Sequence, residues 1–171
     1  MSERTGTNAI LDRAISLGHR VREAEHRTAI YRLLVDLQTA MDERDLERYG
    51  AYYTEDGEWS AVSGRAIGPK NIAAFLKDYC KPWESPEQRT FHSIADVAID
   101  LYGDYAVATG QWRHDHPAGK GPPVTVHFGR FEVIAQRTSD GWRVKRRASY
   151  SLLPYIEPRY QDVGALEAKT L

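Results

Sequence analysis

The chain has 171 residues, of which 42% are hydrophobic and 11% aromatic, an amount that suits one domain with its own core. Its formal net charge is -1, from 23 basic and 24 acidic residues, so we expect no partnership with nucleic acid or an anionic membrane surface. A single cysteine, Cys80, excludes an internal disulfide and a CxxC site. No apolar run approaches the ~18 residues of a membrane span, and the first residues lack a secretory pattern, so we expect a cytoplasmic protein.

The first part of the chain predicts two helices. A loose polar arm precedes apolar spacing over 9–18, which predicts a short helix that ends at Gly18. The spacing then predicts a longer helix over 22–43, with an apolar stripe at intervals of three and four made of Ile30, Leu33, Leu34, Leu37 and Met41.

The middle of the chain predicts two further helices around a short strand. Asp45 is placed to cap a helix that continues to the turn at 55–57. A short strand is expected over 58–62, with a turn at 63–65. Pro69 then opens a helix that runs to about residue 79.

The second half predicts long strands joined by short turns, over 89–101, 105–114, 124–137 and 142–151. This spacing is typical of an antiparallel meander. Helices followed by such a sheet predict an α+β fold, in which a curved antiparallel sheet wraps the long helix as a cone with an apolar pocket at its mouth.

This reading divides the chain into three parts. Residues 1–21 form an arm with a short helix, 22–152 form the α+β domain, and 153–171 form a tail. The tail has apolar side chains but weak periodicity, so we expect it at a subunit interface of a homo-oligomer.

Asp42 and His92 are the first candidates for chemistry. Asp42 ends the long helix, where the helix dipole disfavours an exposed carboxylate by ~0.3–1 kcal/mol. It is either a solvated charge or the partner of another group. If the sheet places His92 against this helix end, Asp42 can accept the Nδ1 proton and leave Nε2 as a general base. His92 is otherwise a structural residue of its strand.

Other histidines permit a different reading. On the strand over 105–114, a regular pleat places the even positions from Ala106 to His114 on one face, together with His116 beyond the strand. These side chains either surround a cavity or pack against the sheet face. His114, His116 and His127 could instead hold zinc or iron. No carboxylate follows at a suitable spacing, so we expect no metal and no organic cofactor.

The last strand and several aromatic residues complete the candidates. Regular alternation places Arg143, Lys145 and Arg147 on one face as a solvated basic stripe. An inward arginine, either Arg146 or Arg147, would stabilise an oxyanion. Candidate substrate-binding walls, for which core packing is the alternative, are Tyr31, Tyr53, Trp59, Trp112 and Phe131.

Four short motifs carry a family resemblance: MDERDL at 41–46, GRAIG at 64–68, RTFH at 89–92 and DGWRV at 140–144. With the order of elements, they resemble the nuclear transport factor 2-like (NTF2-like) superfamily, whose fold is called a cystatin-like α+β barrel. Within it the chain is similar to the SnoaL-like branch, which includes scytalone dehydratase, bile acid 7α-dehydratase and hexachlorocyclohexane dehydrochlorinase. The likeness spans about residues 22 to 152.

The resemblance implies catalytic roles for four residues. The family's aspartate falls on Asp42, its partner histidine on His92, a further histidine of the dehydratases on His116, and the arginine of the dehydrochlorinase on Arg147. A tyrosine that precedes the aspartate in scytalone dehydratase is replaced here by Met41, so a tyrosine-assisted departure of hydroxide does not carry over.

The resemblance also implies a function. We expect a cofactor-independent lyase, a dehydratase that acts on a small hydrophobic cyclic or polycyclic hydroxylated carbonyl compound. The alternatives are an isomerase or polyketide cyclase with the same pair of residues, and a non-catalytic protein that binds a hydrophobic ligand or resembles a dioxygenase small subunit. By the same resemblance we expect a trimer ahead of a dimer.

Overall fold

The computed structural model describes residues 2–81, 90–118 and 121–153, and it begins with one long helix. Helix α1 runs without a break over Ser2–Asp42, so the predicted stop at Gly18 is wrong. Glycine inside a helix costs only about 1 kcal/mol, and the residues around Gly18 favour the helix enough to carry it through. The loop expected at 81–86 falls mostly, and the tail from residue 154 entirely, outside the described residues.

The remaining helices begin where expected, but the second ends earlier: the turn expected at 55–57 lies inside a strand that runs over Tyr53–Ala61. Helix α2 spans Leu46–Ala51, and the Asp45 carboxylate accepts a hydrogen bond from the Arg48 backbone N–H at 3.1 Å, as a helix cap does. Helix α3 spans Pro69–Cys80 and begins at the proline that the sequence singles out.

Six strands form one sheet in the order β2-β1-β6-β5-β4-β3. Their bounds are Tyr53–Ala61 for β1, Gly64–Ile67 for β2, Phe91–Tyr102 for β3, Tyr105–Ala118 for β4, Gly121–Thr138 for β5 and Gly141–Leu153 for β6. The last four form the predicted antiparallel meander.

Two features of the sheet differ from expectation. Strand β1 pairs with β6 in parallel, so the sheet is not purely antiparallel. The motif at 64–68 contributes a strand, β2, where only a turn was expected, because Ala61 and Gly64 pair directly as the hairpin closes. The pairing of β1 with β6 joins segments far apart in the chain, so alternation along one segment does not reveal it.

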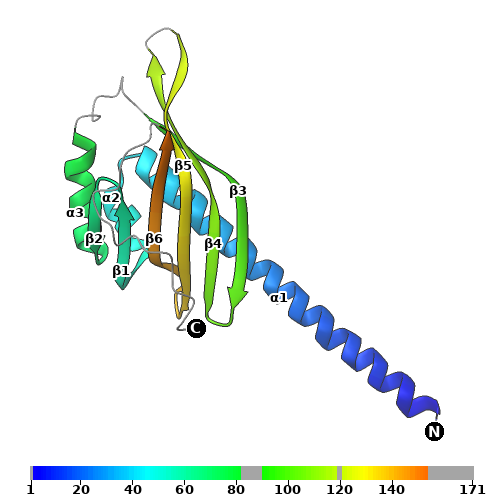
Figure 1. The fold of residues 1–171 in the computed structure, drawn as a ribbon. Coiled ribbons are helices and arrows are strands. Elements are labelled where there is room, and N and C mark those ends of the chain that lie inside the picture. The colour runs from blue at the N-terminus through cyan, green and yellow to red at the C-terminus, as the bar shows by residue number, and fades with distance from the viewer. Residues whose placement is uncertain (1, 82–89, 119–120, 154–171) are drawn as a thin grey trace.

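The core lies between α1 and the sheet (Figure 1). The predicted stripe of α1 packs there: Ile30, Leu34 and Leu37 are fully buried. They meet sheet residues such as Val133 and Val144, which are also fully buried. Burial of this stripe explains why the helix lies across the inner face of the sheet.

The N-terminal part of α1 extends away from the rest of the molecule in Figure 1. It carries exposed large apolar side chains: Ile10, Leu11, Ile15, Leu17 and Val21. No helix of the described residues has the length and apolarity needed to cross a bilayer. The exposed stripe therefore belongs to a helix whose apolar side chains have little contact within the described part of the chain.

Candidate functional site

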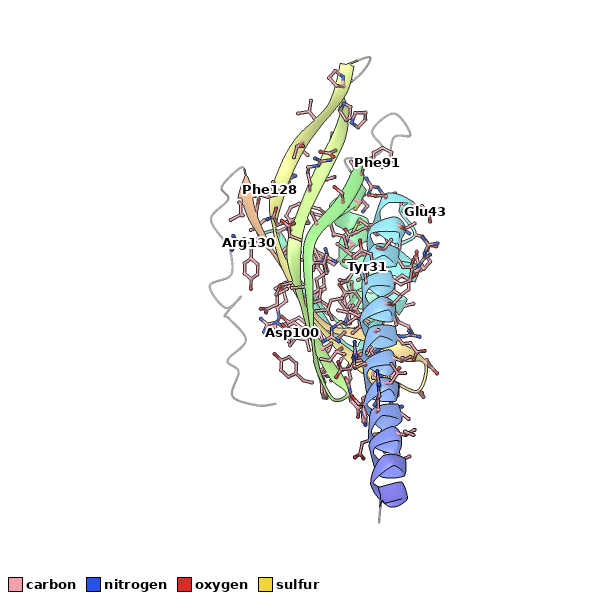
Figure 2. All side chains as sticks on the ribbon, turned by 90° about the vertical axis from the view of Figure 1, so that its right-hand side faces the viewer. Tyr31, Glu43, Phe91, Asp100, Phe128 and Arg130 are labelled. Atoms are coloured by element: carbon pink, nitrogen blue, oxygen red, sulfur yellow. The ribbon has the colours of Figure 1, made fainter. Side chains whose placement is uncertain are left out.

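The C-terminal end of α1 meets the beginning of β3, as the positions of Glu43 and Phe91 in Figure 2 show. The chain reverses at Arg44, whose positive φ of 61° ends the helix abruptly. The Arg44 guanidinium then ties the two segments together, since it donates to the Met41 carbonyl at 2.9 Å and to the Thr90 hydroxyl at 3.0 Å. This arrangement brings Asp42 against His92.

Asp42 and His92 are hydrogen-bonded. The distance from His92 Nδ1 to Asp42 Oδ1 is 2.6 Å, and the His92 backbone N–H donates to both carboxylate oxygens, at 3.1 and 3.0 Å. The contact predicted from the sequence is therefore present, 50 residues apart along the chain. An ionised carboxylate accepts only, so Nδ1 carries the proton and Nε2 keeps its lone pair.

A cavity of about 130 Å³ lies beside this pair, and His92 is part of its wall. Apolar and aromatic side chains form much of the lining, among them Trp59, Trp112 and Leu76. Polar groups reach it from β6, through Arg147 and Ser149. The cavity is a pocket of the kind that binds small organic molecules, with polar and charged groups set among apolar and aromatic walls.

Arg147, not Arg146, reaches the cavity, and a bulge in β6 decides this. Opposite β5, Ile134 pairs with Arg146 but the next residue, Ala135, pairs with Val144, which leaves Lys145 as an extra residue. The alternation shifts by one residue at this point, so buried Val144 and Arg147 share the inner face. The solvated stripe expected from regular alternation is therefore wrong for Arg147, which is only 6% exposed.

Neutral groups surround the Arg147 side chain. With its amide oxygen turned toward the guanidinium, Gln38 accepts from both Nη atoms, at 3.0 and 3.3 Å. The guanidinium lies over the Phe131 ring, with Cζ 5.6 Å from the ring centre, a cation–π contact. Among the described residues no carboxylate pairs with Arg147, and its buried Nε has no acceptor.

Three histidines form a row across neighbouring strands. His92 pairs with His114, and His114 pairs with His127, in directly opposite register. The first two rings stack with centres 4.1 Å apart, and the second pair with centres 5.6 Å apart. Sequence reasoning did not give His114 a catalytic place; its even-position spacing with Trp112 was the available signal.

Burial and mutual repulsion lower the pKa of His114, His116 and His127. Burial, followed by the neighbouring His92, His116 and His127, lowers the pKa of His114 to about 2. Burial also lowers the pKa of His127 and of His116. His114 is therefore neutral over the whole physiological range of pH.

Of the other residues predicted to bind substrate, only some line the cavity. Trp59 and Trp112 line the cavity. Tyr53 instead lies in the core, where its hydroxyl donates to that of Tyr49 at 3.3 Å and burial raises its pKa well above the usual value. Phe131 is buried beneath Arg147, and Tyr31 is 48% exposed on α1, so neither contributes to the lining.

His116 does not line the cavity, although its ring contacts that of His114 edge-on, with centres 4.6 Å apart. The register between β4 and β5 shifts just after His114, which disturbs the alternation that would place His116 beside it. Within the described ranges, no group of His, Cys, Asp and Glu side chains has an arrangement that could hold a metal ion. The zinc or iron reading of the histidine cluster therefore has no geometric support there.

Comparison with known proteins agrees with this architecture. Residues 22–148 match the model of the SnoaL-like domain, whereas comparison with curated proteins gives no significant match. An NTF2-like protein with a cystatin-like fold from Novosphingobium aromaticivorans superposes with a TM-score of 0.71, at 24% identity over 84% of this chain and 92% of that chain.

Two further solved structures come from the same organism. A provisionally assigned aromatic ring hydroxylase has a TM-score of 0.64 and 26% identity, over 77% of this chain and 92% of that chain. A provisionally assigned scytalone dehydratase has a TM-score of 0.65 and 19% identity, over 84% and 97%. The family model covers most of the chain, and the helix and sheet described above superpose on those of the solved structures. The chain therefore belongs to the SnoaL-like domain family, and it has the fold of the NTF2-like protein named above.

Proposed function

We propose that the protein is a cofactor-independent lyase, a dehydratase that removes water from a cyclic hydroxylated carbonyl compound. The observation that carries this proposal is the hydrogen bond between Asp42 and His92 at the wall of an apolar cavity. A carboxylate that orients an imidazole prepares Nε2 to abstract a proton. The provisional assignment of one fold neighbour as a scytalone dehydratase is consistent with this reaction class.

In the proposed reaction, His92 Nε2 removes the proton from the carbon beside the substrate carbonyl. The C–H electrons form an enolate, whose oxygen is stabilised by the guanidinium groups of the cavity wall, Arg147 and Arg44. The enolate then collapses, the C–O bond to the hydroxyl group breaks, and a C=C bond forms. The departing oxygen takes a proton and leaves as water, so the atoms and charges balance.

The protonation states favour His92 as the acid of the second half. The low pKa of His114 makes its imidazolium inaccessible, and His116 does not line the cavity. The imidazolium formed at His92 is therefore the group that returns the proton, and it remains next to the Asp42 carboxylate. His116, to which the resemblance gave this role, acts at most through its contact with His114.

An isomerase or a polyketide cyclase is the second candidate, because the same single base can move a proton without loss of water. A non-catalytic ligand-binding protein or dioxygenase small subunit has no chemical need for an oriented imidazole. One fold neighbour is provisionally assigned as an aromatic ring hydroxylase, so the dioxygenase small-subunit alternative is also tested.

Hydrogen–deuterium exchange separates these readings. Candidate cyclic carbonyl compounds are incubated with the protein in D2O, and deuterium uptake beside the carbonyl and loss of water are followed by NMR and mass spectrometry. We expect both, and we expect His92→Ala to abolish both while His19→Ala, a control on the exposed part of α1, has no effect. Uptake without loss of water favours the isomerase. Full uptake in His92→Ala removes the proposal. Activity should also persist after treatment with EDTA, since no metal is part of the mechanism.

We also propose that the chain forms a homo-oligomer, with a trimer ahead of a dimer by resemblance. The exposed apolar stripe of α1, from Ile10 to Val21, supports a second copy as its partner, because helices in proteins are stabilised mainly by the packing of an apolar face. Arg20 and Glu25 flank the stripe with the five-residue spacing of charged pairs across parallel coiled helices. Light scattering should give a multiple of 19.4 kDa, and Leu17→Glu should reduce it; a monomer at micromolar concentration contradicts this.

A further inference from the structure

Two guanidinium groups, and no carboxylate of residues 2–81, 90–118 and 121–153, line the cavity. Arg44 and Arg147 both belong to its lining, which contains neither Asp nor Glu among the described residues. Arg147 bonds to the neutral amide of Gln38, and Arg44 bonds to a carbonyl and a hydroxyl. Neither arginine forms an ion pair within the described part of the chain.

No other wall group among the described residues offsets this positive charge. His114 is neutral because of its low pKa, and the pKa of His127 is also lowered by burial. Asp42 lies behind His92, outside the lining, and its oxygens already accept bonds from the ring and backbone of that residue. The cavity is therefore an electropositive chamber in a chain whose net charge is close to zero.

A buried cation without a counter-ion is unfavourable for folding, because desolvation is not repaid by an opposite charge. Arg147 is nine-tenths buried in this way, and its Nε has no acceptor. A neutral residue of similar size would fill the same space without this penalty. The charge is explained if a ligand brings the missing anion.

We propose that the substrate is an anion, a single-ring compound whose carboxylate group pairs with Arg147. This inference rests on the proposed function, since it names the substrate class of the same site. A guanidinium offers parallel N–H groups that match the two oxygens of a carboxylate. Gln38 accepts from both Nη atoms, so the parallel pair left for a carboxylate is the Nε–H, which has no acceptor among the described residues, and the outer hydrogen of one Nη.

The size and walls of the cavity suit one ring. Its volume of about 130 Å³ is close to that of an engineered cavity of ~150 Å³ that binds benzene. Trp59 and Trp112 supply flat apolar walls, and Trp59 lies opposite Arg147 on the neighbouring strand. His92 belongs to the same lining, so a ring held through its carboxylate by Arg147 shares one small cavity with the proposed base.

Binding of benzoate and of its neutral isostere benzamide tests the inference. Both are titrated into the protein and followed by tryptophan fluorescence and calorimetry. We expect benzoate to bind at least about tenfold more tightly, and to raise the melting temperature where benzamide does not. Equal affinity for the two compounds overturns the proposal, and the comparison needs no variant.

Variants then locate the anion. Arg147→Met should remove the preference for benzoate, and Arg147→Lys should retain part of it, since lysine keeps the charge but loses the paired N–H groups. Arg146→Met is the matched control, because Arg146 lies on the opposite face, 3.9 Å from Glu58, and should retain the full preference. An unchanged preference in a folded Arg147→Met protein, judged by its NMR spectrum, overturns the assignment.

His92→Ala separates this inference from the proposed function. We expect it to bind benzoate with unchanged preference, since the anion partner is Arg147. Anion binding without any turnover would remove the lyase proposal and keep the anion site. Turnover of neutral substrates, with no preference for benzoate, would keep the lyase proposal and remove the anion site.

Discussion

Asp42→Asn tests the chemistry of the site most directly, because it changes one oxygen to an amide nitrogen and keeps the size of the side chain. The wild-type carboxylate accepts from His92 Nδ1 at 2.6 Å and from the backbone N–H at 3.0 and 3.1 Å. An amide can still accept from the backbone through its oxygen. Its NH2 group then faces Nδ1 as a donor, which forces the imidazole proton onto Nε2 and removes the base.

The magnitude follows from what the oriented base supplies. General base catalysis contributes about 10²–10⁴-fold, so the variant should lose about that factor in kcat. At 1.36 kcal/mol for each factor of ten, this corresponds to a barrier higher by about 2.7–5.4 kcal/mol. Substrate binding should change little, because Asp42 does not line the cavity and acts through His92.

The assay has two readouts. Exchange of the substrate proton in D2O reports the rate, and ¹⁵N chemical shifts of the His92 ring report which nitrogen is protonated. Asp45→Asn is the matched control, since Asp45 lies in the same turn and asparagine caps a helix as well as aspartate does. If Asp42→Asn keeps the Nδ1-protonated tautomer and the wild-type rate, the reasoning is refuted.

Three further predictions concern the fold. The pKa of His114 is about 2 in the folded protein and 6.5 in the unfolded chain, so between these pH values the unfolded chain binds one more proton. The free energy of unfolding should therefore fall as the pH drops from 7 to 4. Thermal melts of His114→Gln should show a smaller fall over the same pH range. Equal slopes would contradict the buried neutral histidine. Gly129→Ala would place a Cβ 1.9 Å from the Tyr150 carbonyl oxygen, so it should lower the free energy of unfolding by about 1–3 kcal/mol in urea titrations. A variant as stable as the wild type would contradict this close packing. Gly18→Ala should increase helicity in circular dichroism, because α1 continues through this position; no change would favour the broken helix that the sequence suggested.

The sequence by itself determined the features that depend on local order. The apolar stripe of α1, the cap at Asp45, the proline at the start of α3 and the alternation of the last four strands all specify conformation within a few residues. The short motifs around Asp42 and His92 were sufficient to place these residues in one family and to predict their contact.

The tertiary structure decided what depends on distant partners. The parallel pairing of β1 with β6 joins segments far apart in sequence, and no local pattern encodes it. The same holds for the bulge at Lys145, which turns Arg147 inward although regular alternation places it with the solvated residues. The row of His92, His114 and His127 arises from the register of three strands. A one-residue shift in register moves every following side chain to the other face, so the composition of the cavity became readable only when the sheet was assembled.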